Sequence, residues 1–251
     1  MLEHWLPEVL LQSIAAENNL SETAFLVSGA EGYELRWFTP EVEVDLCGHA
    51  TLASAHVIFE ELGHASEQVE FATKSGLLSV SRRASFDAET SADGSTHLSH
   101  LRMSLPARKP TKIEEPALLR EALGADLLEV YSSVDLMVVL ASQADVETLL
   151  PDTRALLDYD ALTIVATAPG KDCDFVSRVF APKVGVPEDP VTGSAHCSMI
   201  PYWAERLGKS EMVAKQLSRR GGELECTLKT GGKWVTVGGR AVTYLAGELT
   251  V

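Results

Sequence analysis

The sequence is poor in the features that mark several large protein classes. Basic residues are in the minority, with 21 Lys and Arg against 36 Asp and Glu, and the formal net charge is −15. A nucleic-acid-binding protein normally carries a basic face, and an acidic surface is repelled by anionic membranes. We therefore expect no binding to nucleic acid and no binding to membranes.

Long apolar runs and paired cysteines are also missing. No apolar stretch reaches the roughly 20 residues that a helix needs to cross a bilayer. The first residues, MLEHWLPEVLLQSIAAENN, have no basic segment and predict an amphipathic helix, not a signal peptide. The four cysteines include no C-x-x-C pair, which argues against a structural zinc site. Sparse cysteines without a signal peptide indicate a reducing, cytoplasmic location.

Motifs for nucleotide cofactors and for serine hydrolases are absent as well. The chain has no G-x-x-x-x-G-K-[ST] motif, no strand-linked G-x-G-x-x-G and no G-x-S-x-G elbow. The prediction is a protein that uses neither a cofactor nor a metal.

What the sequence does contain is enough apolar material for a packed core. Its 251 residues are 45% hydrophobic, which suits one large domain or two of ordinary size. The proline-rich, charged stretch PARKPTKIEEP interrupts the apolar periodicity and is the clearest linker. We predict one domain over residues 1–108 and a second over 109–251, with the last strand able to return to the first domain.

The pattern along the chain alternates helices and strands. The first half predicts a helix over 7–18, strands TAFLVSG and YELRWFT around a turn at 29–32, a helix ending near residue 62, a hairpin in QVEFATKSGLLSVSRR, an exposed loop in ASFDAETSADGSTH and a strand in LRMSLPA. The second half predicts helices PALLREALG and ADVETLLPDTRALLDY, strands LMVVLAS and ALTIVATAP, and a terminal β-meander.

An internal repeat is the most informative feature. The segment RWFTPEVEVDLCGHATLASAHVIFEELG aligns with RVFAPKVGVPEDPVTGSAHCSMIPYWAERLG, with three extra residues in the second copy before the Gly turn. Cys47-Gly48-His49 then falls on Thr192-Gly193-Ser194. Each half is therefore a strand, a tight Gly turn and an apolar helix. Because both helices are apolar nearly all round, we predict an α+β fold of two similar domains, each a curved, mostly antiparallel sheet wrapped round a central helix.

The two helix starts are candidate anion sites. A helix N-terminus exposes unpaired N–H groups and partial positive charge, and Gly48 and Gly193 let a ligand approach the backbone closely. Two such starts facing each other across an interdomain cleft suit a small anionic ligand.

Each reactive side chain near these starts has two interpretations. Cys47 is either a thiolate whose pKa the helix start lowers or an inert buried thiol. His49 either binds an anion and moves protons or is structural. Glu188 and Asp189 are either general acid/base groups or acidic capping residues, and Ser194 either holds a carboxylate or caps the helix.

These segments resemble a known family, the PhzF-like proteins of phenazine biosynthesis. The resemblance lies in AAENNLSETAFL, RWFTPEVEVDLCGHATLASAHV, SRVFAPKVGVPEDPVTGSAHC and QLSRRGGEL, and it spans nearly the whole chain. It implies the diaminopimelate-epimerase-like fold, in agreement with the repeat. It also implies a homodimer and a small carboxylate-bearing metabolite as substrate.

The best-understood member of that family is an isomerase that moves a proton between two carbons of a dihydro-hydroxyanthranilate without cofactor or metal. Its catalytic glutamate lies in an NLSE motif, which is Asn19-Leu20-Ser21-Glu22 here. The resemblance implies that Glu22 is the acid/base, with Asp189 and His49 assisting. Substrate binding is implied for the remaining motif positions, Asn19, Gly48, Thr192, Gly193 and Ser194. A glutamate base would suit this work if burial raised its pKa towards neutrality.

Two positions depart from the family pattern. Family members begin with a strand and a Gly-Asn-Pro turn, whereas this chain starts at the following helix. Cys47 stands where the phenazine enzyme has a small residue. Related racemases use two cysteines, one per half, but Thr192 occupies the second position, which disfavours a two-thiol racemase. The alternatives are an epimerase or dehydratase of an amino or imino acid that depends on Cys47, and a non-catalytic small-ligand-binding relative.

Overall fold

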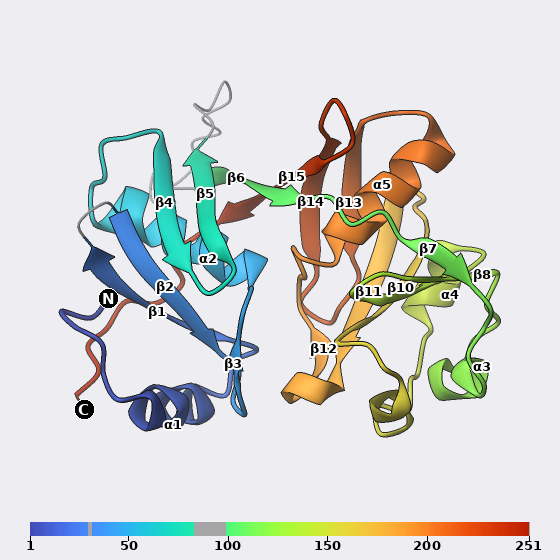
Figure 1. Ribbon diagram of the computed structural model, residues 1–251, viewed down its shortest axis with the longest axis horizontal. Coiled ribbons are helices and arrows are strands. Elements are labelled where there is room, and N and C mark those ends of the chain that lie inside the picture. The colour runs from blue at the N-terminus through green and yellow to red at the C-terminus, as the bar shows by residue number, and fades with distance from the viewer. Residues whose placement is uncertain (30–31, 83–98, 251) are drawn as a thin grey trace.

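Two lobes lie side by side in the molecule, each built of strands that curve around one apolar helix (Figure 1). The computed structural model describes residues 1–29, 32–82 and 99–250. The central helices are α2 (Gly48–His56) and α5 (His196–Leu207). Most neighbouring strands are antiparallel, and the pairs β2/β4, β9/β10 and β11/β13 are parallel. The predicted α+β fold of two similar halves is therefore confirmed.

The first lobe is formed by the elements up to β6. They are α1 (Glu8–Asn18), β1 (Thr23–Gly29), β2 (Gly32–Phe38), β3 (Glu43–Val44), α2, the π-helical turn η1 (Val57–Glu61), β4 (Gln68–Thr73), β5 (Gly76–Arg82) and β6 (Ser99–Pro106). These bounds confirm the predicted helices and the predicted hairpin. The loop predicted over 84–97 and the centre of the predicted turn at 30–31 lie outside the described residues.

The second lobe repeats this plan with more irregular connections. Its elements are β7 (Thr111–Ile113), α3 (Leu119–Leu123), β8 (Glu129–Ser132), β9 (Leu136–Val139), α4 (Gln143–Glu147), η2 (Ala155–Asp158), β10 (Ile164–Pro169), β11 (Phe175–Ala181), η3 (Pro182–Val184), β12 (Val186–Asp189), α5, β13 (Glu211–Gln216), β14 (Gly222–Leu228) and β15 (Trp234–Ala241). The long helix predicted over 144–159 is wrong. Pro151 lacks an N–H and disfavours helical backbone at the residue before it, so the segment splits into α4 and η2.

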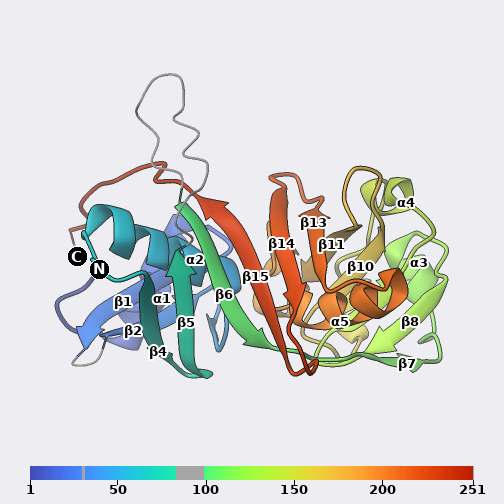
Figure 2. The same ribbon diagram turned by 90° about the horizontal axis from the view of Figure 1, so that it is seen from above.

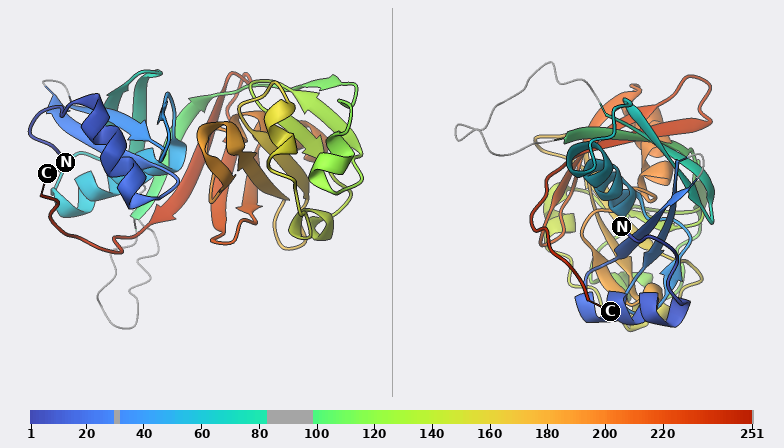
Figure 3. Two further views of the ribbon diagram at one scale, coloured as in Figure 1. Left: turned by 90° about the horizontal axis from the view of Figure 1, so that it is seen from below. Right: turned by 90° about the vertical axis from the view of Figure 1, so that its left-hand side faces the viewer.

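One pair of strands joins the two lobes into a continuous sheet. The pair is β6 and β15, which are antiparallel from Trp234 opposite Pro106 to Ala241 opposite Ser99 (Figure 2). The strand order is β1-β2-β4-β5-β6-β15-β14-β13-β11-β10-β9-β8-β7. The residues after β15 run along the first lobe, and both termini lie at that end of the molecule (Figure 3). The predicted domain boundary at residue 108 stays a prediction.

The sequence repeat reappears as a repeated ion pair. In the first lobe, Arg36 Nε lies 2.7 Å from Glu43 Oε1, and in the second lobe Arg178 Nε lies 2.7 Å from Glu188 Oε1. Each guanidinium donates a second hydrogen bond to the other oxygen of the same carboxylate. Bidentate pairs of this kind fix geometry as well as charge, so both β2–β3 and β11–β12 are held in the same way. Glu188, a candidate acid/base in the sequence, is engaged in this pair.

The two helix starts meet backbone to backbone at the middle of the molecule. A Cβ atom added to Gly48 would lie 3.0 Å from the Cα of Gly193, and one added to Gly193 would lie 3.2 Å from the Cα of Gly48. Around this contact one hydrophobic core extends through both lobes, from Trp37 and Phe71 to Phe175 and Trp203. No side chain larger than hydrogen fits where the starts touch. Among the described residues, no helix is long and apolar enough to cross a membrane.

The close contact between Gly48 and Gly193 predicts that a larger residue at position 48 lowers the stability of the fold. Gly48→Ala should lower the free energy of unfolding by about 1 to 3 kcal/mol, because the new methyl group meets backbone and Met103 at 3.2 Å or less. Gly239→Ala is the control, because its added Cβ meets nothing closer than 3.8 Å. Urea unfolding of both variants measures the difference. Equal stability of Gly48→Ala and wild type would contradict this close packing.

Candidate active site

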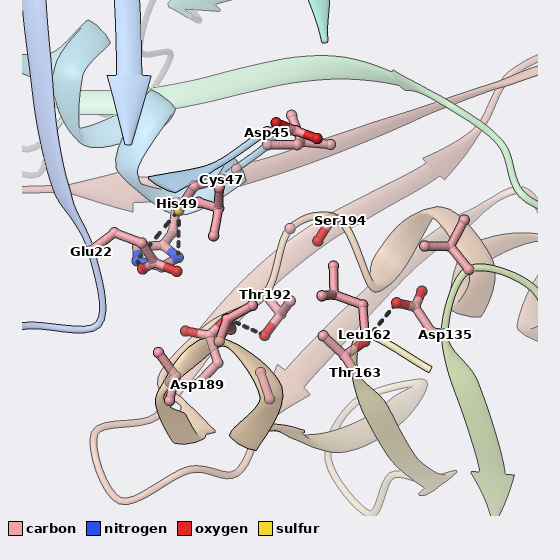
Figure 4. A pocket seen from close by; sticks show the side chains of 18 of the residues that line it. Glu22, Asp45, Cys47, His49, Asp135, Leu162, Thr163, Asp189, Thr192 and Ser194 are labelled. Carbon is pink, nitrogen blue, oxygen red and sulfur yellow. Dashed lines mark hydrogen bonds and ion pairs between the residues drawn. The ribbon is translucent and has the colours of Figure 1, made fainter. Parts of the chain in front are cut away.

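A cavity of about 400 Å³ lies between the lobes, beside the two helix starts (Figure 4). The first lobe contributes Glu22, Cys47, Gly48 and His49, and the second contributes Asp189, Thr192, Gly193 and Ser194. The cavity therefore collects acid, imidazole, thiol and hydroxyl groups that lie far apart in the sequence.

Glu22 and His49 form an ion pair at one end of the cavity. Glu22 lies just before β1 and His49 lies in the first turn of α2, and His49 Nε2 is 3.0 Å from Glu22 Oε2. The side chains are only 10% and 18% exposed. Oε2 has no hydrogen bond of good geometry from any described residue. The contact with His49 is therefore an ion pair without hydrogen-bond geometry, and the oxygen is buried beneath the cavity surface.

The charges of this pair stabilise each other. Burial alone would raise the pKa of Glu22, but hydrogen bonding and charge from His49, with smaller contributions from Ser21 and Cys47, lower it overall. Burial alone would lower the pKa of His49, but the Glu22 carboxylate in contact with the ring raises it well above its usual value. Burial therefore does not bring the pKa of Glu22 towards neutrality, because an imidazolium lies in direct contact with the carboxylate. The free site holds a carboxylate and an imidazolium.

Cys47 sits against the same histidine but is protonated. Its Sγ lies 3.7 Å from His49 Nδ1, and its side chain is buried at the N-cap of α2. Burial raises the thiol pKa to about 11, a stronger effect than the nearby imidazole, which lowers it. A helix start normally favours a thiolate, but here desolvation decides. Cys47 therefore lacks the ionised sulfur that a nucleophile or base requires.

Asp189 faces the cavity from the second lobe. It is 6% exposed and accepts a short hydrogen bond from the Thr192 hydroxyl. Gln216 holds both residues, since its amide nitrogen donates to the Asp189 carbonyl and its amide oxygen accepts the Thr192 N–H, each at 2.8 Å. Burial raises the pKa of Asp189 to about 6, and the other Asp189 oxygen, Oδ1, has no partner among the described residues. Asp189 can thus bind or release a proton near neutral pH.

The predicted site residues converge with two exceptions, which are Glu188, paired with Arg178, and Asn19. Asn19 takes the left-handed conformation that ends α1, is exposed, and is not among the residues that line the cavity. Its predicted role in substrate binding stays a prediction, as do the roles of the residues that do converge.

Sequence reasoning missed the far end of the cavity. Arg108, Asp135, Leu162 and Thr163 also line it. An Asp directly before the apolar run LMVVL was the available signal, because a charged residue at the start of a buried strand lies at the sheet edge.

Three side chains of the first lobe are also arranged as metal donors. One ligand atom each from Glu22, Cys47 and His49 lies within 4.8 Å of the others. Binding there would have to displace protons from the thiol and the imidazolium, which opposes it. The expectation of a metal-free site stays a prediction.

Known proteins resemble this chain along nearly its whole length. The family model described as phenazine biosynthesis-like protein (PhzC-PhzF) matches residues 2–247. A protein of Pseudomonas aeruginosa named an uncharacterized isomerase is 46% identical over 249 residues, which is 99% of this chain and 89% of the relative. The chain belongs to the phenazine biosynthesis-like family.

Solved structures agree with this membership. The crystal structure of a PhzF-family protein of Enterococcus faecalis is 41% identical, with a TM-score of 0.84 over 97% of this chain and 90% of that one. A probable proline racemase of Agrobacterium radiobacter has a TM-score of 0.58 at 12% identity, covering 90% of this chain and 76% of that one. The second likeness concerns the fold alone, and it agrees with the epimerase-like architecture of this family member.

The buried thiol predicts low reactivity. In native protein, 5,5′-dithiobis(2-nitrobenzoate) should react first with the half-buried Cys173, while Cys47 reacts only on the timescale of unfolding. Peptide mapping after timed quenching measures the order. Labelling of Cys47 before Cys173 would show that its thiol is activated.

The raised pKa of Asp189 predicts a stability effect with a definite sign. Folding raises this pKa from 3.8 to about 6, so the stability that proton binding adds is complete below pH 3.8 and is lost as the pH rises through 6. The free energy of unfolding of Asp189→Asn should therefore exceed that of wild type by about 1 to 3 kcal/mol at pH 8, with no such excess at pH 4. The exposed Asp160→Asn is the control. A higher free energy of unfolding for wild type than for Asp189→Asn at pH 8 would refute the prediction.

Proposed function

We propose that this protein is a cofactor-independent isomerase that moves a proton between two carbons of a small carboxylate substrate, in the cleft between its lobes. The observation that carries the proposal is the buried Glu22–His49 ion pair, which shares one cavity with Asp189. Names of relatives support the same class, since the similar Pseudomonas protein is called an isomerase.

The substrate carboxylate would bind at the helix starts. The first N–H groups of α2 are unpaired within the helix, and the turn before α5 brings Gly193 and Ser194 beside them. Backbone N–H groups and the positive ends of two helices favour an anion. Because Gly48 and Gly193 carry no side chain, the two segments approach each other closely beside the cavity.

Glu22 would be the base that takes the proton. It is ionised before substrate binds, which a base requires, but its low pKa makes it weak. A substrate anion that displaces water would raise this pKa by like-charge repulsion and desolvation. Glu22 then removes the proton from one carbon, the electron pair shifts through the adjacent double bond, and Glu22 returns the proton to the second carbon. The substrate gains and loses no atoms.

His49 and Asp189 would assist this transfer. The His49 imidazolium, 3.0 Å from Glu22, orients the carboxylate and balances the negative charge that the substrate brings. Asp189 has an unpartnered oxygen and a pKa near 6, so it can accept a hydrogen bond from a substrate amine or hydroxyl, or exchange a proton with it. Thr192 fixes the direction of the Asp189 carboxylate.

The alternative mechanism based on Cys47 has less support. The thiol is buried and its pKa is raised to about 11, and the equivalent position in the second lobe is Thr192. A one-base thiol epimerase would need the sulfur ionised. We propose that Cys47 is structural, and that the protein acts as a homodimer in the cytoplasm.

Glu22→Gln provides the direct test. The variant should lose about 10² to 10⁴-fold in turnover, because an amide cannot carry the proton, whereas Cys47→Ala should keep most of it. Turnover is measured by ¹H NMR in deuterium oxide, with a dihydro-hydroxyanthranilate and a panel of amino acids as substrates. Incorporation of solvent deuterium at carbon reports the transfer.

The matched control is Glu17→Gln, an exposed acid on α1. It should behave as wild type, and a chelator in all assays tests whether a metal contributes. Full deuterium incorporation by Glu22→Gln would refute the proposal. Binding of panel members without exchange by wild type would favour a non-catalytic relative.

A further inference from the structure

The cavity has two polar corners. The first corner is formed by Glu22 and His49, and the second, its structural counterpart, by Asp135 and Thr163. In the first lobe, Phe38 lies opposite Thr23 on β1, and in the second lobe Phe180 lies opposite Ile164 on β10. Phe38 and Phe180 are aligned by the sequence repeat, so Glu22 and Thr163, each one residue before these partners, occupy equivalent places. Both line the cavity, on opposite sides of the helix starts (Figure 4).

In this second corner, a buried carboxylate takes the place of the first corner's ion pair. Parallel pairing of β9 with β10 brings Asp135 beside Thr163, whose hydroxyl donates to Asp135 Oδ1 at 2.5 Å. The Ser198 hydroxyl of α5 donates to Asp135 Oδ2 at 3.3 Å. Asp135 is 4% exposed. Two hydroxyl donors leave a carboxylate with unused acceptor capacity.

A cation lies close to this carboxylate without binding it. Arg108 lines the same cavity, and its charge favours the ionised form of Asp135. No carboxylate among the described residues comes within ion-pair distance of the Arg108 guanidinium. Its backbone N–H donates to the Cys197 carbonyl at 2.8 Å, which ties this stretch of chain to α5. The corner is thus nearly neutral in charge but rich in polar groups.

The rim of the corner is apolar. Val134 and Leu162 immediately precede Asp135 and Thr163, line the cavity, and are each 49% exposed. Large aliphatic side chains left half in solvent at the mouth of a polar pocket are typical of surfaces that bind the carbon skeleton of a ligand.

A purely structural role accounts poorly for Asp135. Holding two hydroxyl groups requires only an acceptor, which an Asn would supply without a buried charge. Burying a carboxylate without an ion-pair partner costs stability, and burial does raise the pKa of Asp135. Buried ionisable groups with shifted pKa values are concentrated at sites that bind or convert a ligand.

We propose that Asp135, Thr163, Leu162 and Val134 form a second substrate subsite, which accepts a hydrogen-bond donor, either an ammonium or a hydroxyl group, at the end of the substrate remote from its carboxylate. The substrate is then a bifunctional acid: its carboxylate lies at the helix starts, its carbon skeleton contacts Leu162 and Val134, and its donor group faces Asp135. Arg108 supplies the balancing charge. This inference rests on the proposed carboxylate site of the isomerase.

A matched ligand series tests the subsite by binding alone. The probes are 6-aminohexanoate, 6-hydroxyhexanoate, heptanoate and heptanedioate, which share one carboxylate and differ at the far end. Flexible chains let each probe adjust to the span of the cavity. Binding is measured by NMR titration on wild type, Asp135→Asn, Leu162→Arg and the control Lys109→Gln, a neighbouring exposed cation.

Wild type should bind the amino and hydroxy acids about tenfold more tightly than heptanoate. The ratio of the two affinities separates ammonium from hydroxyl as the natural group. In Asp135→Asn the ratio of the affinity for 6-aminohexanoate to that for heptanoate should fall close to one, while the affinity for heptanoate stays unchanged. Lys109→Gln should match wild type. Leu162→Arg changes a half-exposed position and thus preserves folding; it should repel the amino acid and favour heptanedioate.

Several results would overturn the proposal. They are equal binding of all four probes, binding of none of them, a preference that survives Asp135→Asn, and strongest wild-type binding of heptanedioate, which would make the corner an anion site at Arg108. Failure here is distinct from failure of the isomerase mechanism. Glu22→Gln tests proton transfer, whereas these titrations need no turnover.

Discussion

The backbone contact between Gly48 and Gly193 is the constraint on which the rest of the molecule depends. A Cβ atom on either residue would approach the other backbone to 3.2 Å or less, so the two helix starts can meet only as glycines. Their meeting brings side chains of both halves together around one cavity. The same contact lets one hydrophobic core continue from lobe to lobe. The anion site that we propose there would require no charged side chain of its own.

Around that contact, desolvation and charge pairing act in opposite directions on neighbouring groups. Glu22 and His49 remain charged because each is the other's partner at 3.0 Å, although both are buried. For Cys47 and Asp189 burial is the larger effect and raises the pKa of both, although Cys47 contacts His49 and Asp189 accepts a hydrogen bond from Thr192. One small volume therefore contains a permanent ion pair, a carboxyl group that titrates near neutrality and an inert thiol. A proton can be exchanged there without a metal or cofactor, which is the chemistry we propose.

The duplication predicts more about the site than the separate motifs do. Arg36–Glu43 and Arg178–Glu188 keep the same bidentate geometry in both halves, so the scaffold is symmetric. The side chains that face the cavity are not symmetric, since Glu22 is matched by Thr163 and Cys47 by Thr192. A symmetric backbone frame with different side chains in its two halves would bind an asymmetric substrate in one orientation. Asp135 beside Thr163 gives the second half a polar group suited to the far end of such a substrate.

Much of this was readable from the sequence, because periodicity and repetition are local properties. The apolar helices after Gly48 and Gly193, the hairpin at 68–82 and the α+β fold of two similar halves follow from residue patterns, and the structure confirms them. Glu22 could be singled out only by family resemblance, since a Glu between a helix and a strand carries no local signal. Pro151 was a local signal against the long helix over 144–159, but the apolar periodicity on both sides of it favoured one continuous helix.

Only the tertiary structure decided the protonation states and the second corner. The low pKa of Glu22 depends on His49, which lies 27 residues further along the chain, and the high pKa of Cys47 depends on the packing that removes water from it. Asp135 meets Thr163 through parallel pairing of β9 with β10, and meets Ser198 through the position of α5. Electrostatic energies depend on distance and solvent exclusion, and neither quantity exists until the chain has folded.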